Sequence, residues 1–350
     1  MKSFSDRVLA WFDQFGRHDL PWQTPDNPYR VWLSEIMLQQ TQVQTVIPYF
    51  LKFIERFPTV EALAAAPLDQ VLAAWTGLGY YARARNLHRA AQMICQMNGE
   101  FPKTQADWAA LPGIGRSTAS AISAICFGER AAILDGNVKR VLARFLAEPD
   151  WPGSIAAQNR LWRQAETLLP NARLGDYTQA MMDLGATICT RARPQCDRCP
   201  IRSDCQALGK DLVSQLPKPK PRKSRPIKRI WMLIAQAKSG ACFLEQRPPK
   251  GIWGGLHSFP EYSSLEALET DLPLNIQRTE LVPFKHGFTH YELLIHPLHV
   301  ISDHWTQDLH NTPGVWIEPN QSIDVGLSKP AVFLLNQVFE VASNPSAPSA

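Results

Sequence analysis

The chain has 350 residues, of which 45% are hydrophobic and 19% are charged. That composition excludes a disordered chain, and the lack of any run of about 18 apolar residues excludes a membrane-spanning one. The length predicts about two domains. A net charge of +4 is compatible with a polyanionic partner but does not establish one.

The first residues, MKSFSDRVLAWFDQFG, carry Ser5, Asp6 and Arg7 where a secretion signal needs an unbroken apolar run. We therefore expect a cytoplasmic protein, associated with the nucleoid if it is bacterial, that makes no membrane contact. Disulfide bonds are rare in that reducing compartment.

Helical periodicity dominates the chain up to about residue 229. Apolar residues recur every three or four positions, which places them on one stripe of a helix. Two such stripes are Phe4, Val8, Phe12 and Phe15, and Ile47, Phe50, Leu51 and Ile54. Turn signals at 98–99, 111–113 and 151–153 separate the segments, so we predict about ten short helices and an all-α first domain.

The helical segment WLSEIMLQQTQ contains a carboxylic acid among apolar residues. Glu35 stands between Leu33 and Ile36. From the residues alone, two positions remain open: an exposed face of the helix, or a buried site that raises the pKa of the carboxyl group.

The segment LPGIGRSTASAISAICFG, residues 111–128, is typical of a helix-hairpin-helix motif. Gly113 and Gly115 bracket a tight turn before an Ala/Ser/Ile-rich helix. Without side chains, the turn would let backbone N–H groups approach a phosphate near the positive end of that helix. A plain corner between two helices remains the alternative.

About twenty residues later, in ILDGNVKRVLARF, Asp135 directly precedes another amphipathic helix. Taken alone, this residue is best interpreted as an N-cap that accepts a backbone N–H and contributes about 1 kcal/mol.

Four of the seven cysteines lie close together, with six, two and five residues between them: Cys189, Cys196, Cys199 and Cys205. A reducing compartment argues against a disulfide knot and favours a metal site. Four-cysteine zinc sites usually use two C-x2-C pairs, whereas only one pair here has that spacing, yet chemistry alone leaves zinc open beside an iron–sulfur cluster. The other cysteines, Cys95, Cys126 and Cys242, are expected to be small buried hydrophobes.

The segment KPKPRKSRPIKR, residues 218–229, has seven basic residues, no acid and three prolines. It is either a solvated spacer or an extended strand that follows phosphates. We place the domain boundary here: an all-α domain at 1–209, a linker at 210–229, a second domain at 230–343 and a loose tail at 344–350. Strand-like runs flank Ser239-Gly240 and begin again at Glu292, so the second domain should contain a sheet.

The order of these motifs resembles the endonuclease III superfamily of DNA glycosylases: a helix-hairpin-helix, an Asp about twenty residues on, and then the four cysteines. Two further stretches, PYRVWLSEIMLQQTQVQTVIPYF from Pro28 and WTGLGYYARARNL from Trp75, are similar to the MutY-type adenine DNA glycosylases. The resemblance covers nearly the whole chain from Leu20.

This resemblance implies one [4Fe–4S] cluster on Cys189, Cys196, Cys199 and Cys205. The cluster would fold a loop that presents arginines to DNA phosphates, namely Arg191, Arg193, Arg198 and Arg202. It further implies that Glu35 protonates adenine at N7 and later activates water, while ionised Asp135 stabilises the cationic sugar.

The resemblance also implies that adenine is flipped out of the helix and that Gln40 and Tyr80 fill the gap. The residues implied near the extruded adenine or its sugar are Trp22, Ser117, Asn137 and Gln179. Taken singly, the aromatic residues could equally be core residues. Relatives that cleave the DNA backbone carry lysine at the position of Ser117, so we expect a monofunctional enzyme; Lys139 is expected to face solvent or phosphate.

For the second domain the resemblance implies a Nudix-like, α+β fold that reads 8-oxoguanine, matched here by PPKGIWGGLHSFPE and FKHGFTHYEL. The probing residues would be Phe288, Thr289 and His290, with threonine where many relatives carry serine. Only Glu266 and Glu269 remain of the carboxylates that a Nudix hydrolase needs for magnesium, so no nucleotide hydrolysis is expected.

The expected substrate is therefore double-stranded DNA with an A:8-oxoguanine or A:G mispair, acted on by a monomer. Two other readings stay open. One is an endonuclease III-like glycosylase and lyase for oxidised pyrimidines, and the other is a non-enzymatic iron–sulfur sensor that binds DNA.

Overall fold

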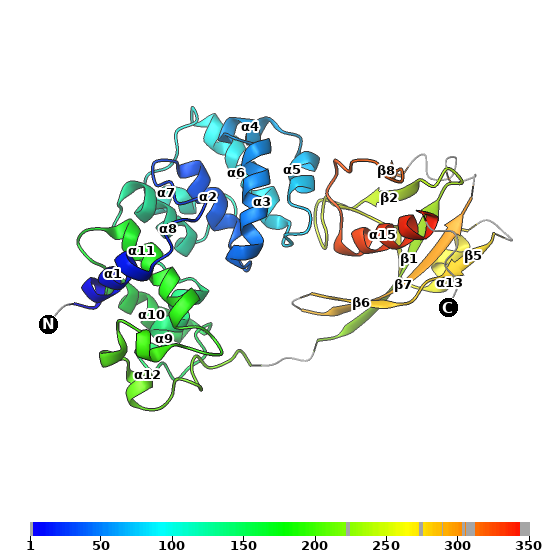
Figure 1. The fold of residues 1–350 in the computed structure, drawn as a ribbon. Coiled ribbons are helices and arrows are strands. Elements are labelled where there is room, and N and C mark those ends of the chain that lie inside the picture. Colours follow the sequence, from blue (N-terminus) through cyan, green and yellow to red (C-terminus); the bar gives the residue numbers. More distant parts are fainter. Residues whose placement is uncertain are drawn as a thin grey trace. The chain divides into compact units, whose positions relative to one another are not determined.

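The computed structural model describes residues 3–221, 225–272, 276–288, 290–302, 305 and 312–343. They form two compact units (Figure 1). The first unit is Met1–Ala65 with Asn86–Arg222, and the second is Ala66–Arg85 with Lys223–Ala350. The packing of Ala66–Arg85 with the second unit is not apparent from the sequence. Thr289 and the tail predicted at 344–350 lie outside the described residues.

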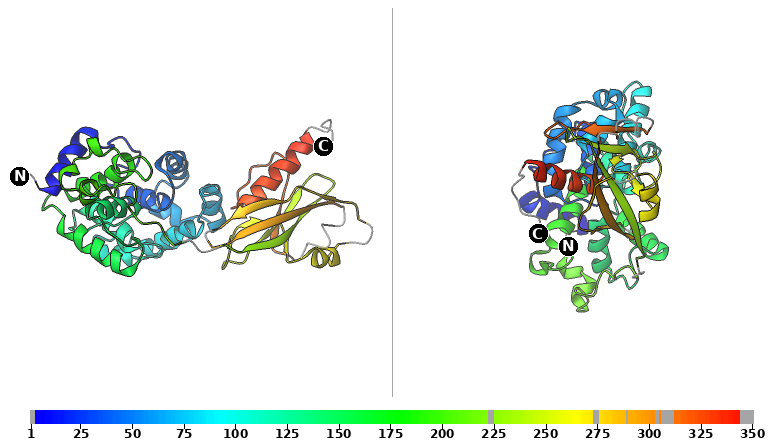
Figure 2. Two further views of the ribbon diagram at one scale, coloured as in Figure 1. Left: turned by 90° about the horizontal axis from the view of Figure 1, so that it is seen from below. Right: turned by 90° about the vertical axis from the view of Figure 1, so that its right-hand side faces the viewer.

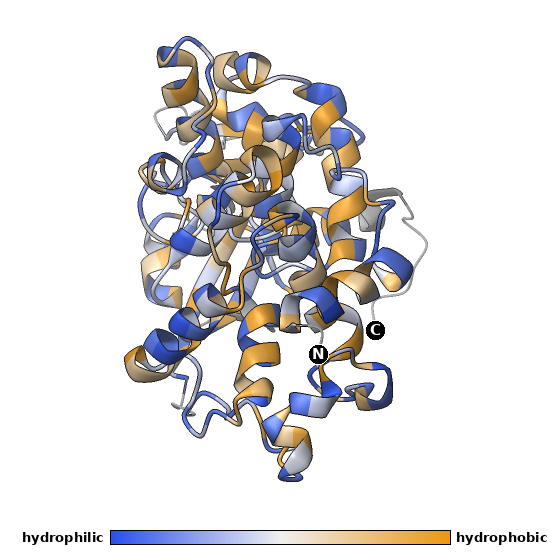
Figure 3. Ribbon diagram, turned by 90° about the vertical axis from the view of Figure 1, so that its left-hand side faces the viewer, coloured by the Kyte–Doolittle hydropathy of each residue, from blue (hydrophilic) through white to orange (hydrophobic). Residues whose placement is uncertain are grey.

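Helices make up the regular structure as far as residue 209, and no described residue before Ile227 lies in a strand. The helices are α1 (Phe4–Phe15), α2 (Pro28–Met37), α3 (Val43–Arg56), α4 (Val60–Ala65), α5 (Leu68–Ala74), α6 (Ala82–Gln96), α7 (Gln105–Ala109), α8 (Arg116–Phe127), α9 (Gly136–Phe145), α10 (Ile155–Thr167), α11 (Leu174–Asp183), a π-helix η1 (Leu184–Ile188), two 3-10 helices η2 (Cys196–Arg198) and η3 (Arg202–Asp204), and α12 (Gln206–Gly209). The helices carry both hydrophobic and hydrophilic residues, as amphipathic packing requires (Figure 3).

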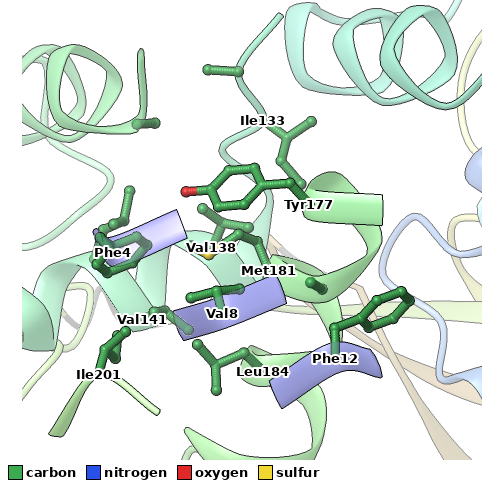
Figure 4. Close-up of a cluster of buried hydrophobic side chains, with 14 of the residues drawn as sticks. Phe4, Val8, Phe12, Ile133, Val138, Val141, Tyr177, Met181, Leu184 and Ile201 are labelled. Atoms are coloured by element: carbon green, nitrogen blue, oxygen red, sulfur yellow. The ribbon is translucent and has the colours of Figure 1, made fainter. Parts of the chain in front are cut away.

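One hydrophobic core joins the N-terminal helix to helices from much later in the chain (Figure 4). Ser3 forms a capping box with Asp6 that starts α1. The stripe of α1 then packs against α9 and α11, through residues that include Phe4, Val8, Phe12, Val138, Val141, Tyr177 and Met181. This core fixes the start of α9 relative to α11, and both of these helices reach the site described below.

Two details of the predicted stripes are wrong. Phe15 is 58% exposed and Leu51 is 50% exposed, whereas the buried residues of α3 are Val46, Phe50 and Phe53. Apolar residues occur on more than one side of α3, so the sequence fits two phases of the helical period. Packing against neighbouring helices selects between them.

The second unit is built around one sheet with strands β1 (Ile227–Gln236), β2 (Cys242–Gln246), β3 (His257–Ser258), β4 (Glu261–Tyr262), β5 (Arg278–Glu280), β6 (Phe284–Gly287), β7 (Glu292–Ile301) and β8 (Gly314–Ile317). The long strands β1 and β7 pair in parallel from Ile227 opposite Glu292 to Gln236 opposite Ile301. The predicted sheet domain is confirmed, and β7 covers the whole run predicted from Glu292.

Helices cover both faces of this sheet (Figure 2). Met232 and Ile234 of β1 pack on α15 (Lys329–Ser343), whereas Leu233 and Ala235 lie in the cluster that includes Leu268 of α13 (Leu265–Thr270). Alternate side chains of β1 therefore pack into the hydrophobic cores on opposite faces of the sheet, which explains the continuous hydrophobic run of this strand.

The predicted linker, 210–229, is only partly extended. Leu216 is buried, and its carbonyl accepts a 2.8 Å hydrogen bond from Arg144 Nε. The last three residues of the predicted range already belong to β1. Across the described ranges, no helix has the length and apolar character needed to cross a membrane.

Candidate active site

A cavity of about 880 Å³ opens in the first unit. It is lined by residues of α2, the loop after it, the start of α8, the start of α9, and α11. Eight of the candidate residues line it together: Trp22, Glu35, Gln40, Gly115, Ser117, Asp135, Asn137 and Gln179. Trp22 and Gln179, which are 157 positions apart in sequence, therefore line the same cavity.

Glu35 lies on the last turn of α2, between residues that the core buries completely or nearly so. Burial raises the pKa of its carboxyl group to about 8, and the negative charge of Asp135 acts in the same direction. At neutral pH the group is therefore protonated and able to donate a proton into the cavity.

Asp135 is the N-cap of α9, as its position before an amphipathic helix predicts. Its Oδ1 accepts a hydrogen bond of 2.8 Å from the Val138 N–H, and its Oδ2 accepts one of 3.1 Å from Asn137 Nδ2. Both oxygens act as acceptors, which suits a carboxylate. Asp135 is thus both the N-cap of α9 and a residue that lines the cavity.

The turn between α7 and α8 brings the helix-hairpin-helix residues to the same region. Gly113 has a φ of 78°, and a Cβ there would lie 2.7 Å from the Cβ of Asn86, so both conformation and space require glycine. Gly115 is the N-cap of α8, with open space around it. Ser117 Oγ accepts a 3.0 Å hydrogen bond from the Leu134 N–H, which ties α8 to the segment directly before α9.

The sequence did not single out several residues that complete the cavity. Arg17 binds the fully buried Asp183 through its backbone N–H (2.7 Å) and its Nε (3.0 Å), and Gln179 Nε2 donates to the same carboxylate at 2.8 Å. The neighbours of Gln40 in the polar run QQTQVQ at 39–44 also line the cavity. That run was a usable signal, whereas Arg17 and Asp183 meet only in the folded chain.

The four clustered cysteines line a second, narrow cavity with Arg144 and Ile201. Burial raises the pKa of Cys199 to about 11, and the other three cysteines act in the same direction, so the four thiols are electrostatic neighbours. In the part of the chain that is described, no three His, Cys, Asp or Glu side chains could hold a single metal ion. A multi-atom cluster spaces its ligands more widely than one ion does, and four thiols around one cavity fit that demand.

Arg144 supports this loop from within the core. Only 3% of Arg144 is exposed, and its guanidinium donates to the carbonyls of Thr190 (2.7 Å) and Arg191 (3.1 Å) and to Cys189 Sγ (3.4 Å). A buried cation is costly without a compensating negative charge, which cysteine thiolates would supply.

The remaining candidate residues lie in the second unit. Tyr80 is 51% exposed with a φ of 51°. Phe288 packs on Trp253 and Tyr291, with ring centroids 5.3 Å and 4.9 Å away, and His290 is exposed. Thr289 falls outside the described part of the chain.

Comparisons with known proteins agree with this architecture. The model of the HhH-GPD superfamily of base excision DNA repair proteins matches residues 33–167, and that of the NUDIX domain matches residues 230–337. An adenine DNA glycosylase of Buchnera aphidicola (subspecies Baizongia pistaciae) is 38% identical over 346 residues, 96% of each chain. The adenine DNA glycosylase of Homo sapiens is 44% identical over 224 residues, which are 61% of this chain and 41% of that protein.

Among solved structures, a thermostable thymine-DNA glycosylase is similar with a TM-score of 0.54 and 27% identity, covering 59% of this chain and 95% of that one. An endonuclease III–DNA complex, with a TM-score of 0.51 and 24% identity over 59% of this chain and 94% of that one, shares the fold. The predicted resemblance is confirmed: the chain belongs to the adenine DNA glycosylase family and acts as a base excision repair glycosylase.

Proposed function

We propose that this glycosylase hydrolytically removes adenine paired with 8-oxoguanine or guanine in double-stranded DNA, without cleaving the strand. The observation that supports this most is the pair of carboxyl groups in one cavity, one with a raised pKa and one whose two oxygens both accept hydrogen bonds.

Glu35 is the proposed general acid. Adenine leaves as a poor anion unless it gains a proton as the N-glycosidic bond breaks. A carboxyl group with a pKa of about 8 keeps its proton at neutral pH and can pass it to N7 of the extruded base. The carboxylate that remains then takes a proton from the attacking water.

Asp135 is the proposed partner of the cationic sugar. Its position is fixed by the Val138 N–H and the Asn137 side chain, so its charge does not have to reorganise when the positive sugar forms. The side chains proposed to hold the adenine and its sugar in the same cavity are Trp22, Ser117, Asn137 and Gln179.

The proposal that the enzyme does not cleave the strand rests on which side chains line the cavity. Ser117 offers a hydroxyl where a lyase needs an amine for a Schiff base. Lys139, which follows Asp135 on α9, is not among the described residues that line the cavity.

A [4Fe–4S] cluster is the proposed cofactor, held by Cys189, Cys196, Cys199 and Cys205. The four thiolates would hold it, and it would tie down the loop without offering an open site for substrate. The cluster loop supplies exposed cations for DNA phosphates: Arg191, Arg193, Arg198 and Arg202. Gly113 and Gly115 would contribute backbone N–H groups to the same strand.

The second unit is the proposed reader of the opposite strand. Phe288, Thr289 and His290 would contact 8-oxoguanine, while Gln40 and Tyr80 fill the gap that the flipped adenine leaves. The proposed limits are 1–209 for catalysis and 230–343 for reading. The enzyme would act as a monomer in the cytoplasm, at the nucleoid in a bacterium.

Chromatographic detection of the released base tests this function. Free adenine should appear from A:8-oxoguanine and A:G duplexes, with strand breaks only after alkali treatment. An A:T duplex and a thymine glycol duplex are the controls and should release nothing. Release of thymine glycol with a strand break would instead indicate an endonuclease III-like enzyme, and release of no base at all would indicate a sensor.

A further inference from the structure

The turn that carries Tyr80 is held in one conformation by its neighbours. Gly77, Gly79 and Tyr80 all have positive φ angles, of 96°, 75° and 51°. The Gly79 carbonyl accepts hydrogen bonds from Trp75 Nε1 and Arg83 Nη2, both at 3.1 Å. A tyrosine in a left-handed conformation is uncommon, and the surrounding contacts must stabilise it.

This segment is bound to the loop that leads into α15 (Figure 1). Tyr81 Oη donates to the Leu327 carbonyl at 3.0 Å, and the Leu327 N–H donates to Thr76 Oγ1 at 3.4 Å. A Cβ on Gly326 would lie 2.6 Å from the Cβ of Leu72, so α5 packs directly on the backbone there. The hydroxyl groups of Tyr81 and Thr76 thus bind the backbone carbonyl and the backbone N–H of Leu327, a residue of the Nudix-like domain.

A third contact connects the same segment to the residues around Phe288. Arg85 Nη1 donates to the Gly254 carbonyl at 2.5 Å. The preceding residue, Trp253, has a φ of 54° and packs on Phe288 with ring centroids 5.3 Å apart. Trp253 also contacts His286, and both rings meet Phe288. Ring contacts therefore connect Phe288 to Trp253, whose neighbour Gly254 is bound by Arg85.

We propose that Arg85 is a positioning residue that couples the reading of the base opposite adenine, at Phe288, to the placement of Tyr80. The inference rests on the proposed function, because it takes Phe288 as part of the reader and Tyr80 as the residue that fills the stack. The contacts run from Phe288 through Trp253 and the Gly254 carbonyl to Arg85 at the start of α6, one turn after Tyr80.

A guanidinium–carbonyl bond suits this task. It is charge-assisted and directional, so it holds the Gly254 peptide more firmly than a neutral bond would. Arg85 itself is half-buried, which limits competition from water. Removing the bond should leave the chemistry at the cavity intact and weaken only the advantage that 8-oxoguanine gives.

The test compares Arg85→Met with Arg89→Met, a matched loss of one cation one turn further along α6 at an exposed position. Single-turnover rates of adenine release are measured on A:8-oxoguanine and A:G duplexes. Arg85→Met should lower the ratio of the two rates by about tenfold, within the usual range of coupling between sites, with the A:G rate within about twofold of wild type. Arg89→Met should leave the ratio unchanged.

A double-mutant cycle gives the decisive readout. Phe288→Leu should lower the ratio in the wild-type background and have little further effect beside Arg85→Met. Equal effects in both backgrounds, or equal losses on both duplexes with Arg85→Met, would overturn the coupling. Arg85→Lys keeps the charge and a hydrogen-bond donor, so it should restore part of the ratio of the A:8-oxoguanine rate to the A:G rate. A ratio for Arg85→Lys no higher than that of Arg85→Met would count against the proposal.

The coupling and the proposed function fail in different ways. A wild-type enzyme that prefers A:8-oxoguanine and keeps that preference with Arg85→Met refutes the coupling alone. A wild-type enzyme that shows no such preference refutes the proposed function and the coupling with it.

Discussion

The pH dependence of adenine release is the sharpest consequence of the environment of Glu35. With a pKa of about 8, the carboxyl group is about 90% protonated at pH 7 and about 10% protonated at pH 9. An ordinary glutamic acid would be protonated to less than about 1% at pH 7. The fold thus keeps a proton on the proposed general acid at neutral pH.

Single-turnover rates on an A:8-oxoguanine duplex between pH 6 and pH 10 measure this. The rate should be level near neutrality and fall about tenfold per pH unit above the pKa of Glu35. Glu35→Gln should be slower by a factor of about 10² to 10⁴ and lose this alkaline limb, while its affinity for the duplex is retained. A wild-type rate that stays level to pH 10, or a glutamine variant as fast as wild type, would refute the reasoning.

The same substitution has a consequence for stability. The folded state raises the pKa of Glu35, so it favours the neutral form. The contribution to the free energy of unfolding is then fully present below about pH 4.5 and is lost as the pH rises through about 8. Glutamine is neutral throughout, so the Tm of Glu35→Gln should gain on wild type between pH 5 and pH 9. A constant difference in Tm would show that folding does not raise the pKa of Glu35.

Four further substitutions test other parts of the protein. Asp135→Asn should lower adenine release by at least about 10²-fold, with a Tm close to wild type because asparagine is also a good N-cap. Ser117→Lys should produce a borohydride-trapped DNA adduct that the wild type lacks, because an amine can form a Schiff base with the sugar. Cys199→Ser should lose iron on elemental analysis and lower the Tm, and unchanged iron would contradict the ligand assignment. Arg144→Met should also lower the iron content, since the loop loses its internal donor.

The fold class of each unit could be predicted from the sequence because it depends on the local pattern of apolar and polar residues. The helical period before residue 209 and the apolar run of β7 are visible in a few consecutive residues. The order of the helix-hairpin-helix, Asp135 and the four cysteines along the chain then indicated the family. The N-cap position of Asp135 was likewise local, because it follows from the residue and the helix after it.

The features that sequence did not provide depend on contacts between distant segments. Arg17 meets Asp183 across 166 positions, and Arg85 meets Gly254 across 169. The phase of α3 was also chosen by tertiary packing, which buried Val46 and left Leu51 exposed. No window of neighbouring residues contains that information.

The proposed transfer of a proton from Glu35 to N7 of adenine is tested most directly with a duplex that carries 7-deazaadenine opposite 8-oxoguanine. That base has a carbon in place of N7 and cannot accept the proton there. The enzyme should bind this duplex as tightly as the adenine duplex and release no base from it. Release at a rate similar to that of adenine would show that protonation at N7 does not drive the reaction.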